Sequence, residues 1–186
     1  MRKLIVFNHV SLDGYFTDAN SDMRWAHKRD EEWNTFIKGN AKGDCVFVFG
    51  RKTYDMMASY WPTPMASENS PEVAESMNKL PKIVFSRTLD KASWNNTKLV
   101  KSDPAAEVRR LKQESGPDLM IFGSGTIISQ LTQEGLIDEF QIIVCPMIVG
   151  KGKALFEGVQ GKPGLKLTKS RIFKNGNVFL VYEPAA

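Results

Sequence analysis

Glycine and hydroxyl residues directly follow an apolar run in the second half of the chain. Gly123, Ser124 and Gly125 come after the run at 118–122, and Thr126 opens a helix-like pattern. Glycine lets the backbone approach a ligand closely, and the first amides of a helix attract anions. The spacing predicts a phosphate-binding turn, although a tight turn without a ligand explains the same two glycines equally well.

Two further apolar runs end in groups that bind anions. These groups are Gly50, Arg51, Lys52 and Thr53 after one run, and Ser86 and Arg87 after another. Arginine offers a planar fork of donors to a phosphate, and lysine offers a point charge. If the three runs are neighbouring strands, their ends meet in one crevice. Taken alone, each cation is more often a solvated surface residue.

The elements that would position these groups alternate along the chain. Continuous apolar runs indicate strands buried on both faces, and a period of about 3.6 indicates helices. The expected strands are at 3–10, 44–50, 81–86 and 118–123, and the expected helices are at 30–39, 71–78, 103–116 and 126–135. Asp103 is the expected N-cap of its helix, with Pro104 in the first turn. Gly39 and Gly116 are expected to end their helices.

After residue 136 the helical period disappears. Segments 136–150, 164–173 and 177–184 have the pattern of strands, and Asn175-Gly176 indicates a hairpin between the last two. Segment 59–81 is rich in Pro, Ser and Asn and is expected to be a surface excursion. The pattern predicts one α/β domain over 1–186, with a mostly parallel central sheet and antiparallel strands at its C-terminal edge.

Composition and charge argue against several classes of protein. Hydrophobic residues make up 42% and charged residues 25%, as in ordinary soluble domains. No apolar run reaches the ~18 residues of a membrane span, and the first residues are unlike a signal peptide, so the cytoplasm is expected. The net charge of +4 is scattered, so nucleic acid is not an expected partner. Cys45 and Cys145 lack the spacing of a metal site or a disulfide and are expected to be buried thiols.

The order of these motifs resembles the dihydrofolate reductase-like fold, and within it the C-terminal reductase domain of the riboflavin-biosynthesis enzyme. The segments that carry the resemblance are SLDGYF (11–16), FGRKTYD (49–55), IVFSR (83–87), IFGSGTIISQL (121–131) and DEFQIIVCPMIVGKGKALF (138–156). The resemblance implies a three-layer α/β/α architecture with a mixed sheet of about eight strands. It also implies a homodimer, NADPH as cofactor, and hydride transfer to a pterin-like or pyrimidine-like substrate.

The resemblance further implies which residues contact the cofactor. It assigns the phosphates to Gly50, Arg51, Lys52 and Thr53, the pyrophosphate to Gly123, Ser124, Gly125 and Thr126, the adenosine 2'-phosphate to Ser86 and Arg87, the adenine to Lys101 and Ser102, and the nicotinamide end to Asn8 and Phe16. The loop at 11–16 would cover the nicotinamide. His9, inside an apolar strand, is expected to be a core histidine.

Asp30 is the candidate catalytic acid. It follows Trp25 by five residues at a helix start, the position at which the resemblance places a substrate-binding carboxylate. Partial burial would raise its pKa and let it hold a protonated heterocycle. The alternative is that Asp30 is a first-turn acid favoured by the helix dipole.

The sequence departs from its relatives in ways that bear on the substrate. The segment before the strand at 81–86 lacks the arginine that grips the folate tail, and Ile143 replaces a strand threonine. The zinc motif of the riboflavin enzyme's deaminase domain is not found in these 186 residues. Three functions stay open: a reductase of another heterocycle, a nucleotide-binding module without turnover, and a true dihydrofolate reductase.

Overall fold

The computed structural model describes residues 1–26, 30–41 and 43–185. The strands are β1 (Leu4–Ser11), β2 (Tyr15–Asp18), β3 (Cys45–Gly50), β4 (Lys82–Phe85), β5 (Thr97–Val100), β6 (Asp118–Phe122), β7 (Glu139–Cys145), β8 (Gly152–Ala154), β9 (Leu165–Ile172) and β10 (Val178–Pro184). The helices are α1 (Glu31–Ala41), α2 (Arg51–Tyr60), α3 (Pro64–Asn69), α4 (Pro71–Lys79), α5 (Pro104–Gln113) and α6 (Gly125–Gln133), with a short 3-10 turn at Arg24–Ala26.

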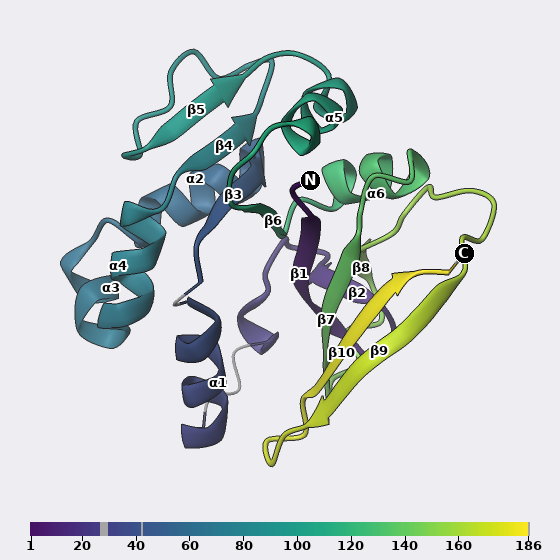
Figure 1. Cartoon of the computed structure of the whole chain (residues 1–186). Helices are drawn as coiled ribbons and strands as arrows, with labels where there is room; N and C mark the ends of the chain where they lie inside the picture. The colour runs from purple at the N-terminus through teal and green to yellow at the C-terminus, as the bar shows by residue number, and fades with distance from the viewer. Residues whose placement is uncertain (27–29, 42, 186) are drawn as a thin grey trace.

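An eight-stranded mixed sheet forms the centre of the molecule, in the order β5-β4-β3-β6-β1-β7-β10-β9 (Figure 1). The pairs from β5 to β7 are all parallel. The last two pairs, β7 with β10 and β10 with β9, are antiparallel. This arrangement confirms the predicted mostly parallel sheet with antiparallel strands at one edge. Strands β2 and β8 form a separate two-stranded sheet.

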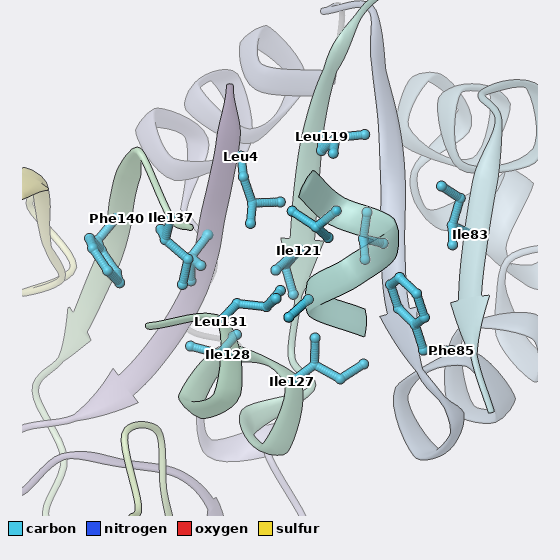
Figure 2. Close-up of a cluster of buried hydrophobic side chains, with 14 of the residues drawn as sticks. Leu4, Ile83, Phe85, Leu119, Ile121, Ile127, Ile128, Leu131, Ile137 and Phe140 are labelled. Carbon is cyan, nitrogen blue, oxygen red and sulfur yellow. The ribbon is translucent and has the colours of Figure 1, made fainter. Parts of the chain in front are cut away.

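Helices cover both faces of the sheet and give the three-layer architecture. On one face, α5 and α6 pack on the strands through a cluster in which Ile121 and Ile128 are fully buried (Figure 2). On the other face, Trp33 of α1, Tyr54 of α2 and Met77 of α4 are buried against the sheet. Strands β1, β3 and β4 lie between these layers, and most of their residues are buried.

The helix at 103–116 begins as predicted but ends early. Asp103 is its N-cap, because its carboxylate accepts the N–H of Ala106 at 2.9 Å, and Pro104 is the first helical residue. The C-cap is Glu114, whose ψ of 157° is extended, so the expected stop at Gly116 was wrong. Gly116 lies in the turn that follows, where its φ of 150° is open to it.

The remaining differences involve short elements and a helix interior. Helix α1 continues through Gly39 to Ala41, because a helix tolerates glycine at a modest cost. The sequence did not reveal β5, β2, β8 or α3, each of three to six residues. The segment at 59–81 is more structured than expected, since α3 and α4 bury Ala66 and Ala74.

Both cysteines are buried free thiols, as predicted. Burial, with a smaller effect of Asp44 and Asp118, raises the pKa of Cys45 to about 11. Within the described ranges, no three His, Cys, Asp or Glu side chains group closely enough to hold a metal ion. In the same ranges, no helix has both the length and the apolar character that crossing a bilayer requires.

Candidate functional site

The ends of five parallel strands line up in one row. Gly50 pairs with Phe85, and Phe85 pairs with Val100. Gly123 donates its N–H to Oδ1 of Asn8 at 2.8 Å, and the Asn8 amide donates back to the Gly123 carbonyl at 3.1 Å. The expectation that these strands are neighbours is therefore met, and the residue that follows each strand emerges at the same edge of the sheet.

Two helix N-termini meet in this row. Helix α2 begins at Arg51 after Gly50, and α6 begins at Gly125 after Ser124. Gly50 donates its N–H to the Ser124 hydroxyl at 2.8 Å, and Ser124 donates its own N–H to the Thr53 hydroxyl at 3.0 Å. The first amides of each helix lack intrahelical partners, so the partial positive charges of two helix dipoles lie side by side.

Contacts within the protein explain both glycines of the turn. Gly123 has a φ of 54°, and a Cβ there would lie 2.8 Å from the Thr53 hydroxyl. At Gly125 a Cβ would lie 2.7 Å from the ring of Phe16. The protein's own side chains therefore occupy the space that a side chain would need. Any anion-binding capacity of the turn lies in the helix amides rather than in the missing side chains.

The basic groups expected at the site are at the surface of the same edge. Arg51 pairs with Asp55 at 2.6 Å and donates to the Thr88 hydroxyl at 3.4 Å. Its guanidinium therefore reaches from the end of β3 to the turn after β4. The other expected residues that are exposed here are Lys52, Arg87, Lys101, Ser102 and Thr126.

Ser86 has a local structural contact of its own. Its hydroxyl accepts the N–H of Leu89 at 3.0 Å and that of Thr88 at 3.3 Å. The side chain thus closes the turn that carries Arg87. Contact of Ser86 with a ligand stays a prediction.

The loop after β1 is fastened to the segment after β7. The carboxylate of Asp13 accepts the Ser11 hydroxyl at 2.6 Å and the N–H groups of Val149 and Gly150 at 3.1 and 2.7 Å. These hydrogen bonds, led by that of Ser11, lower the pKa of Asp13 to about 2. Strand β2 then pairs with β8. The sequence predicted only that this loop covers the nicotinamide, because nothing local points to partners so far along the chain.

Asp30 caps α1, accepting the N–H of Trp33 at 2.7 Å. This contact is expected if Asp30 serves the start of the helix rather than catalysis. The same residue lines an open groove of about 790 Å³ between α1 and the β9–β10 hairpin, with Phe36, Arg171 and Lys174 among the other lining residues. None of the described lining residues belongs to the row of strand ends.

His9 is packed among aromatic rings. Its ring makes edge contacts with Phe7 and Trp33, at centroid distances of 5.9 and 5.6 Å. Asn8 is 4% exposed, and its amide is occupied by Gly123. His9 is partly buried beside these rings, and Asn8 fixes the position of the glycine turn.

Comparison with known sequences identifies relatives along almost the whole chain. The family model for the RibD C-terminal domain matches residues 2–179. "Uncharacterized protein YyaP" of Bacillus subtilis (strain 168) is 29% identical over 182 residues, which cover 97% of this chain and 94% of YyaP. "Uncharacterized protein YwjB" of the same organism is 24% identical over 173 residues, which cover 92% of each.

Solved structures share the fold at low sequence identity. A Shewanella sp. PV-4 protein named for riboflavin biosynthesis has a TM-score of 0.74 at 23% identity, with 99% of both chains covered. A pyrimidine reductase-like protein of Corynebacterium diphtheriae has a TM-score of 0.63 at 13% identity, covering 100% of this chain and 92% of that one. A diaminohydroxyphosphoribosylaminopyrimidine deaminase/5-amino-6-(5-phosphoribosylamino)uracil reductase of Thermotoga maritima has a TM-score of 0.66 at 15% identity, covering 99% of this chain and 57% of that one. The chain belongs to the RibD C-terminal domain family and has the dihydrofolate reductase-like fold of these neighbours.

Proposed function

We propose that the chain is an NADPH-dependent reductase that transfers a hydride to a small pterin-like or pyrimidine-like substrate. The observation that carries this proposal is the meeting of the α2 and α6 N-termini through Ser124, Thr53 and Gly50. Membership of the RibD C-terminal domain family supports the reductase class. Names of the structural neighbours, which include a pyrimidine reductase-like protein, support the substrate class.

The pyrophosphate of the dinucleotide would bind where the two helices meet. The amides of Gly125 and Thr126 begin α6, and those of Arg51 and Lys52 begin α2. Each N-terminus carries a partial charge of about +0.5, which suits a group with two negative charges. The ammonium group of Lys52 would add a full charge beside them.

The adenosine 2'-phosphate would bind at the turn after β4. Arg51 already extends to Thr88 in this turn, and Arg87 is exposed there. A phosphate monoester carries more negative charge than the Asp55 carboxylate and would compete with it for the Arg51 guanidinium. Lys101 and Ser102 follow the neighbouring strand β5 and would flank the adenine. This arrangement favours NADPH over NADH.

The bound cofactor would supply the hydride, and the chain would position it. Asn8 would act through Gly123, whose backbone it holds by two hydrogen bonds. Phe16 would cover the first turn of α6. We further propose that Asp30 holds a protonated heterocycle with the carboxylate that also caps α1.

A comparison of NADPH with NADH tests the cofactor. At about 100 times its dissociation constant NADPH should stabilise the protein by about 2.7 kcal/mol, measured by thermal unfolding. Replacing Arg87 by Gln should weaken NADPH roughly tenfold or more and leave NADH unchanged, because a charge-assisted hydrogen bond contributes about 1.5–3 kcal/mol. Lys166→Gln, which removes an exposed cation from β9, is the matched control. Equal stabilisation by the two dinucleotides would refute the 2'-phosphate assignment.

The second candidate is a module that binds the dinucleotide without turnover. The helix cap that Asp30 provides for α1 explains this residue without a catalytic role. Oxidation of NADPH in the presence of pterin, pyrimidine or quinone-like acceptors would distinguish the reductase from the binding module. The same assay with dihydrofolate tests whether the chain is a dihydrofolate reductase. Asp30→Asn is a clean variant, since asparagine caps a helix about as well as aspartate. Loss of turnover with unchanged stability would support Asp30 as the acid, whereas unchanged turnover would exclude it.

A further inference from the structure

Cations occur throughout the chain, but one segment in its last third has no acid to balance them. Residues 162–174 contain four lysines and one arginine and neither aspartate nor glutamate, so this segment carries a charge of +5. The whole chain carries +4, which leaves the rest of the protein close to neutral. A local excess of one sign of charge attracts a partner of the opposite sign.

Most of this segment forms β9, which lies at the edge of the central sheet (Figure 1). Strand β10 pairs with one side of β9, and in the part of the chain that the structure describes no strand pairs with the other side. All eight residues of β9 are exposed. An edge strand presents unpaired backbone N–H and C=O groups, so β9 can accept a further strand.

Two cations lie on the face of β9 that is turned toward α1. Arg171 pairs with Phe179 of β10, and Lys169 pairs with Val181. Side chains paired across neighbouring strands point to the same face, and Phe179 and Val181 belong to the cluster that contains Trp33 of α1. Lys169 and Arg171 also line the open groove beside α1, which leaves room for the side chains of an added strand.

The positive charge on this face is only partly neutralised. Arg171 pairs with Glu32 of α1 at 2.9 Å, and its guanidinium lies 4.6 Å from the centre of the Phe173 ring. Lys169 has no ion-pair partner among the residues that the structure describes. An acidic side chain on a neighbouring strand would supply one.

The aliphatic side chains of β9 lie on the opposite face. Leu167 pairs with Tyr182, which packs against the cluster beneath α5 and α6, and Ile172 pairs with Val178. Leu165, Leu167 and Ile172 are 43, 49 and 78% exposed, respectively. A row of exposed aliphatic side chains favours a surface that a partner covers.

We propose, independently of the reductase activity, that β9 binds an extended acidic segment of a partner protein as a ninth strand of the sheet. Backbone hydrogen bonds along the edge would supply affinity, and the side chains would supply specificity. Successive side chains of a strand point to opposite faces, so the segment must alternate acidic with aliphatic residues. Its acids would face Lys169 and Arg171, and its aliphatic residues would lie beside Leu167 and Ile172. Both kinds of cross-strand pair stabilise a sheet.

Other occupants fit this edge less well. A second copy of β9, paired antiparallel about its middle, would set Lys166 opposite Arg171, and like charges directly opposite each other destabilise a strand pair. A nucleic acid would neutralise the cations but would leave Leu167 and Ile172 exposed to water. An acidic strand satisfies the charges, the aliphatic face and the backbone edge together.

Peptide binding is the first test. The probe is a fluorescent peptide as long as β9 that alternates glutamate with valine, and anisotropy with the full chain measures its dissociation constant. A block peptide of the same composition cannot place its acids and its valines on opposite faces. It should bind roughly tenfold or more weakly, because several cross-strand pairs are lost together. Equal binding of the two peptides would overturn the proposal.

Reversal of one charge tests the acidic contact. Lys169→Glu should weaken the alternating peptide roughly tenfold or more, because a repulsion replaces an attraction. Lys169 is exposed, so the variant should fold, which circular dichroism would check. Lys91→Glu, at an exposed lysine between β4 and β5, makes the same change in net charge and should bind like the wild type. Equal binding by the two variants would refute the contact at β9.

Methylation of the peptide backbone distinguishes an added strand from a peptide held by charge alone. Alternate N–H groups of the bound segment would point toward β9, and the others would point to solvent. N-methyl groups on the first set should abolish binding, whereas N-methyl groups on the second set should largely preserve it. Equal effects of the two sets would show adsorption by charge and would contradict the added strand.

Hydrogen exchange identifies what covers the edge. The alternating peptide should slow exchange of the amides at 165–172. Exchange that slows with rising protein concentration, before any peptide is added, would mean that a second copy occupies β9. Tighter binding of single-stranded DNA, or of vesicles rich in phosphatidylserine, would assign the cations to phosphate groups. Either of these last two results would exclude the acidic strand as the partner.

Discussion

The side-chain oxygens of Thr53 and Ser124 lie 3.1 Å apart, although 71 residues separate them in the sequence. This contact joins the first turns of α2 and α6. Ser124 adopts φ 60° and ψ 44°, a left-handed conformation that costs a residue other than glycine about 1–2 kcal/mol. The hydroxyl offsets this cost by accepting the N–H of Gly50. A serine, rather than the glycine the conformation favours, therefore holds the two helix starts together.

Replacing Ser124 tests this contact. Ser124→Ala keeps the left-handed strain and leaves the Gly50 N–H without its acceptor, so the free energy of unfolding should fall by about 1–3 kcal/mol. Ser124→Gly loses the same hydrogen bond but relieves the strain, so its free energy of unfolding should fall by less. Urea unfolding of both variants measures the difference. An alanine variant as stable as the wild type would show that the hydroxyl is dispensable.

Gly125→Ala should force the Phe16 ring away from α6. The added Cβ would lie 2.7 Å from that ring, and overpacking of this kind costs about 1–3 kcal/mol. In a Phe16→Ala background the same substitution should cost less, which a double-mutant cycle would record as coupling of about 1 kcal/mol or more. Gly39→Ala, whose new Cβ would meet nothing within 4 Å beyond the backbone of its own helix and its chain neighbours, should instead stabilise α1. Additive effects at 16 and 125 would contradict the contact.

The hydrogen bonds that Asp13 accepts from Val149 and Gly150 should weaken in acid. The folded-state pKa of Asp13, about 2, lies below the ordinary value of 3.8, so the contribution of Asp13 is present above about pH 4 and is lost as the pH falls through about 2. Asp13→Asn should expose the amides of Val149 and Gly150 to faster hydrogen exchange at neutral pH. The variant should lack the extra rise in exchange that the wild type shows between pH 4 and 2. Identical profiles for both proteins would remove Asp13 from this role.

Lys82 should make stability rise in alkali. It is 1% exposed, its ammonium group donates to three backbone carbonyls, and it lies 4.6 Å from the centre of the Trp94 ring. Burial lowers its pKa to about 8, so between about pH 8 and 10 the unfolded chain binds more protons than the folded one. The free energy of unfolding should therefore increase over this range, by about 1.4 kcal/mol for each pKa unit.

Lys82→Met should lack this increase, and Lys79→Met, at an exposed residue of the preceding helix, should retain it. Denaturant unfolding between pH 7 and 10 gives the comparison. Parallel profiles for the wild type and Lys82→Met would mean that the carbonyls hold the ammonium charged throughout.

The sequence predicted what local patterns encode. Buried runs such as that ending at Gly50 marked the parallel strands, and Asp103 with Pro104 marked the start of α5. Strand β5 was not predicted, because polar and apolar residues alternate only weakly in TKLV, and two of its four residues are a lysine and a threonine. This segment is a strand because it pairs with β4 in the sheet, and not because of its own composition.

Long-range side-chain contacts were beyond prediction. Asp13 and Gly150 are 137 residues apart, and neither residue carries a signal of the other. The sequence likewise carries no signal of the contact between the Phe16 ring and Gly125. For β9 the alternation predicted a strand, but it could not reveal which face the helices cover.

The pairing of β2 with β8 has a kinetic consequence. A dinucleotide bound at the start of α6, as proposed, would meet Phe16 on a segment that pairs with β8, so this segment would not move as an independent flap. Entry and release would then require the stretch around 147–154 to move together with it. Residence time at the helix start should respond to changes in that distant stretch, even at positions that never touch the bound molecule.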